Sequence, residues 1–242
     1  MDTMAGKRGG VKGFLSERML RTAGMVSPGN CVADIGCDHA YTSIYLVEQG
    51  IAPFVVAMDV NRGPLARAKE NVCKFGMQEQ ISIRLSDGLA GLLPGEADTV
   101  LIGGMGGPLT ERILSEYPEV LASVKELVLQ PQSEIAGVRR FLHDNGFRIT
   151  KEDMLWEEGK YYTILRAEPG EGEAWTEEEY RYGKYLNPAA YSVLREFLSE
   201  EERKAKEVLA GLETAGTRKA LQRKQEVLEA LQYNAEMGKK FE

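Results

Sequence analysis

The chain has 242 residues, of which 43% are hydrophobic and 28% charged, and its net charge is −7. This length predicts one α/β domain with a smaller addition, and no segment reaches the roughly 20 apolar residues of a membrane helix. Three cysteines without a C-x-x-C pair, and only two histidines, predict no metal site and reduced thiols in a cytoplasmic protein. The acidic net charge does not favour nucleic-acid binding, although a local basic face would allow it.

The chain begins with a polar, glycine-rich segment that lacks the apolar core of a signal peptide, and we expect residues 1–13 to be flexible. The apolar spacing of residues 14–26 then predicts a helix that Ser16 can cap. Basic residues gather at this end of the chain: Lys7, Arg8, Lys12, Arg18 and Arg21. RNA contact and solvated charges around a packing helix explain them equally well.

Between residues 32 and 168, short apolar segments alternate with helical ones, which predicts an α/β fold with a mostly parallel sheet. The expected parallel strands span 32–35, 54–59, 81–85, 99–102 and 127–129, and the expected helices span 39–48, 64–75 and 133–145. The last two apolar segments, 147–153 and 161–166, are too close in sequence for a crossover helix. We therefore expect them to pair as an antiparallel edge.

A change of composition after residue 168 predicts a linker at 169–175 and a helical domain at 176–242. Asn187 and Pro188 begin a long helix, and Gly216 allows a turn into a returning one, which predicts an antiparallel hairpin. Its apolar residues follow a coiled-coil heptad seam with a flaw at Glu201. The seam comprises Tyr191, Leu194, Leu198, Glu201, Ala205, Val208, Leu212 and Ala215, then Leu221, Lys224, Leu228, Leu231 and Ala235.

The first strand leads into a tight turn at Gly36, where an open α/β sheet binds nucleotide-like ligands. The turn lacks the G-x-G-x-x-G pattern of dinucleotide sites. Asp38 would repel a pyrophosphate but suits a cationic ligand such as S-adenosylmethionine. The alternative is that Asp38 only caps the following helix.

Acidic residues also follow the next two strands. Asp59 ends the second strand, 23 residues after Gly36, where a carboxylate typically binds ribose hydroxyls. Asp87 and Gly88 follow the third strand and can meet an adenine edge. Together with Asp38, these acids indicate a Rossmann-like, class I methyltransferase domain. The predicted donor-binding residues are Asp34, Gly36, Asp38, His39, Asp59, Asp87, Gly88 and Gly103.

Four glycines surround Met105 in residues 103–107, after the fourth strand. They allow a planar base to approach the backbone closely, and Met105 can pack on its face. We predict Gly103, Met105 and Gly106 as the catalytic positions. The alternative is a tight turn before the next helix, which would need only one or two glycines.

Three segments together resemble the bacterial tRNA (adenine-22, N1) methyltransferases, the TrmK family: residues 34–41, the glycine segment 103–107, and Leu129-Gln130-Pro131-Gln132. The resemblance extends from about Leu15 to the end of the chain. It implies S-adenosylmethionine as the methyl donor and N1 of a tRNA adenine as the acceptor. The family usually has serine where this chain has Cys37, an exchange that is tolerated if the backbone N–H is the working group.

The resemblance implies direct methyl transfer, because adenine N1 carries a free lone pair and needs no general base. Asp34 then only orients its loop. We expect tRNA contacts at Arg18, Arg218, Lys219, Arg223 and Lys224, although the last four also fit a solvated face. The alternatives are methylation of another RNA or a small molecule, and a non-catalytic donor-binding assembly protein. A nicotinamide-dependent oxidoreductase is opposed by the missing glycine motif. The oligomeric state stays open, and a monomer is compatible with the sequence.

Overall fold

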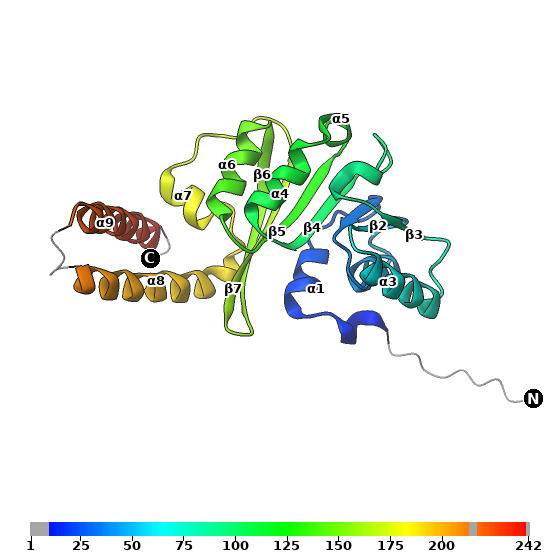
Figure 1. Ribbon diagram of the computed structural model, residues 1–242, viewed down its shortest axis with the longest axis horizontal. Coiled ribbons are helices and arrows are strands. Elements are labelled where there is room, and N and C mark those ends of the chain that lie inside the picture. Colours follow the sequence, from blue (N-terminus) through cyan, green and yellow to red (C-terminus); the bar gives the residue numbers. More distant parts are fainter. Residues whose placement is uncertain (1–9, 213–216, 241–242) are drawn as a thin grey trace, which may run out of the picture.

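The structure of the protein is a computed structural model, and residues 10–212 and 217–240 are described. One seven-stranded sheet runs through the molecule in the order β3-β2-β1-β4-β5-β7-β6 (Figure 1). Strands β1 to β5 are parallel, and β7 is antiparallel to both β5 and β6. The strands are β1 Val32–Ile35, β2 Val55–Asp59, β3 Ile81–Leu85, β4 Thr99–Met105, β5 Glu126–Pro131, β6 Phe147–Glu157 and β7 Lys160–Pro169. The predicted mostly parallel sheet with an antiparallel edge is confirmed.

Helices cover both faces of the sheet, and each face has its own apolar core. Ala33 and Ile35 of β1 belong to the core beneath α4 to α6, and Val32 belongs to the core beneath α1 to α3. The strand is therefore buried on both faces, as its run of small and branched residues predicts. The helical segments are η1 Val11–Phe14, α1 Glu17–Ala23, α2 Tyr41–Glu48, α3 Arg62–Phe75, η2 Gly88–Gly91, α4 Gly107–Ser115, α5 Pro118–Leu121, α6 Ile135–Asp144, α7 Glu177–Tyr182, η3 Pro188–Ala190, α8 Tyr191–Leu212 and α9 Arg218–Lys239.

Several predicted boundaries move in the structure. The first helix begins at Glu17 rather than residue 14, and the Ser16 hydroxyl does cap it by accepting a hydrogen bond from the Met19 N–H at 3.3 Å. Strand β4 continues through Met105, so residues 103–105 are not a loop. They keep pairing because Gly103 lies opposite Gln130, with a bulge before Met105 that Gly104 accommodates at a φ of 78°.

The two long helices α8 and α9 project from the β6–β7 edge of the sheet, at the opposite end of the molecule from α3 (Figure 1). The Asn187 side chain accepts a hydrogen bond from the Ala189 N–H at 3.1 Å, as expected of the residue that begins this segment. The predicted seam residue Ala215 and the predicted turn residue Gly216 lie outside the described residues.

The predicted seam of the returning helix is wrong by one position. Leu221 and Leu228 are 62% and 49% exposed. The buried residues of α9 are instead Ala220, Val227, Asn234 and Met237. The shift has a physical reason: α9 packs against α7 as well as α8, so two partners select its inner face. The coiled-coil packing inferred from the seam is therefore not reproduced in α9.

A third apolar core joins this helical part to the sheet. It contains Met154 of β6 and Tyr182 of α7 together with Leu194, Leu198 and Met237 of the long helices. A buried ion pair lies beside this core. Arg139 Nε of α6 is 2.8 Å from Glu152 Oε1 of β6, and both side chains are at most 1% exposed. Glu152 also accepts hydrogen bonds from the backbone of Lys184 and Tyr185. The domain division at residue 176 stays a prediction.

Candidate active site

Two neighbouring cavities open at the carboxyl ends of β1, β2 and β4. We call the first the α1 cavity, of about 350 Å³, and the second the β2 cavity, of about 320 Å³. Both are lined by Gly36, Gly103 and Gly104. This shared glycine floor lies between β1 and β4, where the strand order reverses direction, which is where open α/β sheets bind their ligands.

The β2 cavity carries the predicted acids of the second and third strands. Asp59 is 9% exposed, and its Oδ1 accepts a hydrogen bond from the Asn61 N–H at 2.8 Å. Asp87 lies at the rim with a half-exposed side chain and pairs with Arg112 at 3.0 Å. Leu109 and Ile113 of α4 add an apolar wall. A buried carboxylate beside an apolar surface suits a nucleoside, whose ribose is polar and whose base is flat.

The α1 cavity is lined by two further predicted residues, Asp34 near the end of β1 and Asp38 in the loop that follows it. Asp38 is not a helix cap, because α2 begins at Tyr41 and its capping position, Ala40, makes no side-chain cap. The Asp38 side chain is instead 67% exposed. The backbone N–H of Asp38 donates a hydrogen bond to Asp59 Oδ2 at 3.3 Å. The carboxylate therefore faces the cavity mouth and is available to a cationic ligand.

Arg18 lies inside this cavity rather than on an outer RNA-facing surface. Its Nη1 donates to Gln130 Oε1 at 2.6 Å, and its guanidinium lies 4.9 Å from the centre of the Tyr162 ring. Its Nε is buried without a hydrogen bond, and the nearest carboxylate, Glu157, is 3.8 Å away. The Arg18 guanidinium has further N–H donors, which can bind an anionic group that enters the cavity.

The glycines of residues 103–107 have two different roles. Gly103 and Gly104 line both cavities, whereas Gly106 and Gly107 line neither. A Cβ at Gly107 would stand 2.6 Å from the Ser133 carbonyl oxygen, and one at Gly106 would stand 3.1 Å from Ser133 Oγ. The last two glycines therefore allow α4 to begin against the β5–α6 connection. Of the three predicted catalytic positions, only Gly103 and Met105 border a cavity.

Gly36 is favoured by its backbone conformation and lies directly against Met105. Its φ is 75°, and a Cβ there would overlap the methyl group of Met105. Met105 thus packs against Gly36 on the floor of the β2 cavity. The adjacent Cys37 N–H donates to the Met58 carbonyl at 2.9 Å, so it orders the loop instead of facing a ligand. Exchange of Cys37 for serine is compatible with that bond, since the backbone makes it.

Some predicted residues lie elsewhere. His39 borders neither cavity; its ring stacks on Tyr41 with a centroid distance of 5.9 Å. By contrast, Gly88 borders the β2 cavity as predicted. Its φ is 56°, and Ile113 would lie 3.2 Å from a Cβ placed there. The basic residues Arg218, Lys219, Arg223 and Lys224 are all on α9, away from both cavities.

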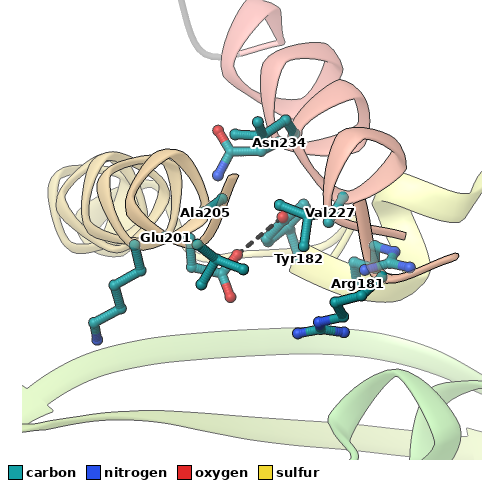
Figure 2. Close-up of a pocket in the computed structure, with 11 residues that line it drawn as sticks. Arg181, Tyr182, Glu201, Ala205, Val227 and Asn234 are labelled. Carbon is teal, nitrogen blue, oxygen red and sulfur yellow. Dashed lines mark hydrogen bonds between the residues drawn. The ribbon is translucent and has the colours of Figure 1, made fainter. Parts of the chain in front are cut away.

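Arg223 lines a third cavity, of about 230 Å³, among α7, α8 and α9. Figure 2 shows the Tyr182 hydroxyl bonded to Glu201 inside it, at 2.9 Å. This explains the glutamate that interrupts the predicted seam: its carboxylate has a buried partner. Burial raises the pKa of Glu201. Asn234 closes the cavity and donates to the Leu198 carbonyl at 2.9 Å.

The sequence reasoning did not assign Gln130 and Gln132 to the site. Gln130 is 1% exposed at the end of β5, and its Oε1 accepts from both Arg18 and the Gly104 N–H, at 2.6 and 3.1 Å. Gln132 lines the same cavity. A polar side chain directly after the apolar residues Leu127–Leu129 was the available signal, because a buried amide needs partners.

The pKa of Asp34 is raised to about 6, mainly by burial; the Ser43 hydroxyl opposes the shift by donating at 2.6 Å, and the Asp59 carboxylate adds to it. Burial likewise raises the pKa of the Cys37 thiol, so that this cysteine is a poor nucleophile.

Within residues 10–212 and 217–240, no group of three His, Cys, Asp or Glu is placed to hold a metal ion. Over the same residues, no helix is long and apolar enough to cross a membrane.

We expect Asp34→Asn to stabilise the protein at neutral pH. The folded state holds the Asp34 proton more tightly than the unfolded state, so wild-type stability falls as pH rises from 3.8 to about 6. Removing the charge should recover up to about 3 kcal/mol above that window, since one pKa unit is about 1.4 kcal/mol. Urea denaturation across this pH range measures it. Ser43→Ala is the control and should destabilise; equal pH dependence in wild type and Asp34→Asn would contradict the prediction.

The strand order, the switch point between β1 and β4 and the acids that follow β1 and β2 define a class I, S-adenosylmethionine-dependent methyltransferase. The family model of tRNA (adenine(22)-N(1))-methyltransferases, TrmK, matches residues 32–236. The chain therefore belongs to the TrmK family, which confirms the resemblance noted in the sequence. The match includes the helical part as well as the sheet.

Individual relatives agree with this assignment. The tRNA (adenine(22)-N(1))-methyltransferase of Bacillus subtilis is 38% identical over 160 residues, covering 66% of this chain and 67% of that protein. The crystal structure of B. subtilis TrmK matches with a TM-score of 0.78 at 29% identity, over 92% of this chain and 97% of that one. A Streptococcus pneumoniae protein, with the same proposed activity and solved with S-adenosyl-L-methionine, matches at 34% identity and a TM-score of 0.79, over 92% and 98%.

Proposed function

We propose that this chain methylates N1 of adenine 22 in tRNA, with S-adenosylmethionine as the methyl donor. The observation that carries the proposal is the pair of cavities that share one glycine floor. A donor that spans this floor presents its methyl group at the junction, and a base can approach there from outside. The names of the relatives supply the position of the adenine and the kind of RNA.

The residues present fit each part of the donor. Asp59 in the β2 cavity would hold the ribose hydroxyls, and the apolar wall of Leu109 and Ile113 would contact the adenine. In the α1 cavity, Asp38 would face the ammonium group, and the guanidinium of Arg18, which also lines the cavity, would face the carboxylate. This assignment moves Arg18 from the predicted tRNA contacts to donor binding.

The chemistry required of the protein is mainly alignment. Bound S-adenosylmethionine supplies a methyl group on a cationic sulfur. Adenine N1 already carries a lone pair, so no residue of this chain needs to remove a proton first, and orientation alone can supply effective molarities of roughly 10⁵–10⁸ M. Because N1 lies on the Watson–Crick edge, the adenine must be unpaired or flipped out. The exposed Gly104 backbone leaves room for it, and Asp38 can stabilise the cationic product.

The proposal is tested by incubating the purified chain with unmodified tRNA and donor, followed by nucleoside analysis and primer extension. We expect 1-methyladenosine and a reverse-transcription stop at adenine 22. A methylated product of another kind would show that the substrate is a different RNA or a small molecule. Intact binding of S-adenosylhomocysteine without any methyl transfer would favour a non-catalytic binding protein.

We expect Asp59→Ala to weaken binding of S-adenosylhomocysteine by about 1–3 kcal/mol, the usual cost of removing one partner of a charged hydrogen bond. The carboxylate also accepts the Asn61 N–H, so Asp59→Asn separates the two roles by keeping an acceptor. Isothermal titration calorimetry measures the affinity. Asp144→Ala, an exposed residue of α6, is the matched control. Wild-type affinity in folded Asp59→Ala would remove this residue from the donor site.

A further inference from the structure

Three aromatic rings form a stack next to the loop between β1 and α2. The rings of Phe14 and Tyr41 lie 5.0 Å apart with planes 13° from parallel, and His39 lies 5.9 Å from Tyr41 with planes 2° from parallel. Phe14 is 51% exposed. We call Phe14, Tyr41 and His39 the aromatic stack. Tyr41 packs against the core beneath α1 to α3 and Phe14 meets the ring of Phe75, but the Phe14 end of the stack remains exposed to solvent.

The position of the stack links it to the site. Asp38 and Thr42 line the α1 cavity. Two of the rings belong to their neighbours in the sequence, because His39 follows Asp38 and Tyr41 precedes Thr42. Asp38 Oδ1 also lies 3.5 Å from His39 Nε2, so the His39 end of the stack is next to a residue that lines this cavity. An RNA that delivers an adenine to the glycine floor can therefore extend over the stack.

Cations border the stack at both ends. Lys74 Nζ lies 5.7 Å from the centre of the Phe14 ring, and Arg67 Nη1 lies 3.5 Å from His39 Nε2. Both cations are on the exposed side of α3. One acid is also present, because Asp38 Oδ1 lies 3.5 Å from His39. Aromatic faces next to cations are the combination that binds single-stranded nucleic acid, by stacking on the bases and neutralising the phosphates.

A second exposed aromatic pair fits RNA less well. Trp156 is 52% exposed and lies 4.4 Å from the Tyr161 ring on the β6–β7 hairpin. Glu196 and Glu200 are close enough to Tyr161 to raise the pKa of its hydroxyl, together with burial. A polyanion would be repelled there, whereas the aromatic stack has cations beside it.

We propose that the aromatic stack binds an unpaired nucleotide of the RNA next to the target adenine, with Arg67 and Lys74 meeting the adjacent phosphates. The inference rests on the proposed function, because it assumes an RNA substrate. It adds a substrate-contact surface on η1, α2 and α3, separate from the donor site and from the basic residues of α9.

The test replaces Phe14, which has no part in the donor site. Stacking contributes about 1–3 kcal/mol per base, so Phe14→Ala should raise KM for tRNA about tenfold while kcat and the affinity for S-adenosylhomocysteine stay unchanged. Phe14→Trp keeps a ring and should restore KM. Leu93→Ala, at a 69% exposed residue elsewhere on the surface, is the matched control and should change nothing.

Two further measurements keep the proposal falsifiable if Phe14→Ala is destabilised. Ultraviolet cross-linking of the wild-type protein to tRNA should give adducts on the peptides that contain Phe14, His39 or Tyr41. The double variant Arg67→Gln, Lys74→Gln should reduce the salt dependence of tRNA binding by about 0.7 in log–log slope for each phosphate of the unpaired strand that is no longer neutralised. An unchanged KM in folded Phe14→Ala, or no adducts together with an unchanged slope, overturns the proposal. Absence of 1-methyladenosine with wild-type protein would instead refute the proposed function.

Discussion

Gly103→Val should abolish methyl transfer while the protein still folds. A Cβ at Gly103 meets no heavy atom within 4 Å, and its backbone is not in the left-handed region, so a side chain can be attached there without backbone strain. The added methyl groups would project from the floor that both cavities share. Because a misplacement of about 1 Å can cost on the order of 100-fold in rate, we expect at least that reduction in kcat/KM for tRNA.

A graded series makes the result specific. Gly103→Ala adds one methyl group and should give an intermediate rate, and Gly63→Ala on α3 also meets open space and should retain full activity. Tritium transfer from labelled donor to tRNA measures the rate, and thermal melting checks the fold. Gly106→Val is less suitable, because Ser133 would be 3.1 Å from its Cβ and the start of α4 would move. Full activity in Gly103→Val would show that this glycine floor is not where the methyl group is transferred.

Local patterns were enough to predict the sheet and the acids that line the two cavities. The apolar segments at residues 32–35 and 81–85 became strands with the same bounds, since no other local structure suits short branched runs between helices. Asp59 was found because its position depends only on the end of its own strand. Such features follow from a few neighbouring residues and from the rule that parallel strands end at one edge.

Features that depend on distant partners could not be predicted. Arg18 was taken as a surface cation because nothing in α1 shows that Gln130, 112 residues away, would bind its guanidinium. Met105 was placed in a loop because four glycines suggest a turn, whereas pairing with β5 keeps the segment in the sheet. The buried face of α9 is determined by its contacts with both α7 and α8, and the heptad pattern of α9 alone does not predict those contacts.

Neutralising Arg218, Lys219, Arg223 and Lys224 with glutamine should strongly weaken tRNA binding. All four are exposed on the first two turns of α9, the densest basic cluster of the helical part. Arg223 is paired with Glu226 at 2.9 Å, but this pair is solvated and phosphate can compete for it. Each phosphate that these residues no longer neutralise should flatten the log–log salt slope by about 0.9. Filter binding across a salt series measures both effects, and donor affinity should not change.

Charge removal is a cleaner experiment here than truncation near Gly172. Truncation would take away the Lys184 and Tyr185 N–H groups that bond Glu152, and would expose Met154 of the shared core. A buried ion pair deprived of its other hydrogen bonds destabilises the sheet, so a fall in activity would have two explanations. Gln substitutions at Arg203, Lys204, Lys206 and Lys239, which pair with glutamates on the same two helices, remove the same four charges and provide the control for net charge. If the four-residue variant and this control bind tRNA equally well, α9 stabilises the protein rather than contacting RNA, and recognition depends on the aromatic stack.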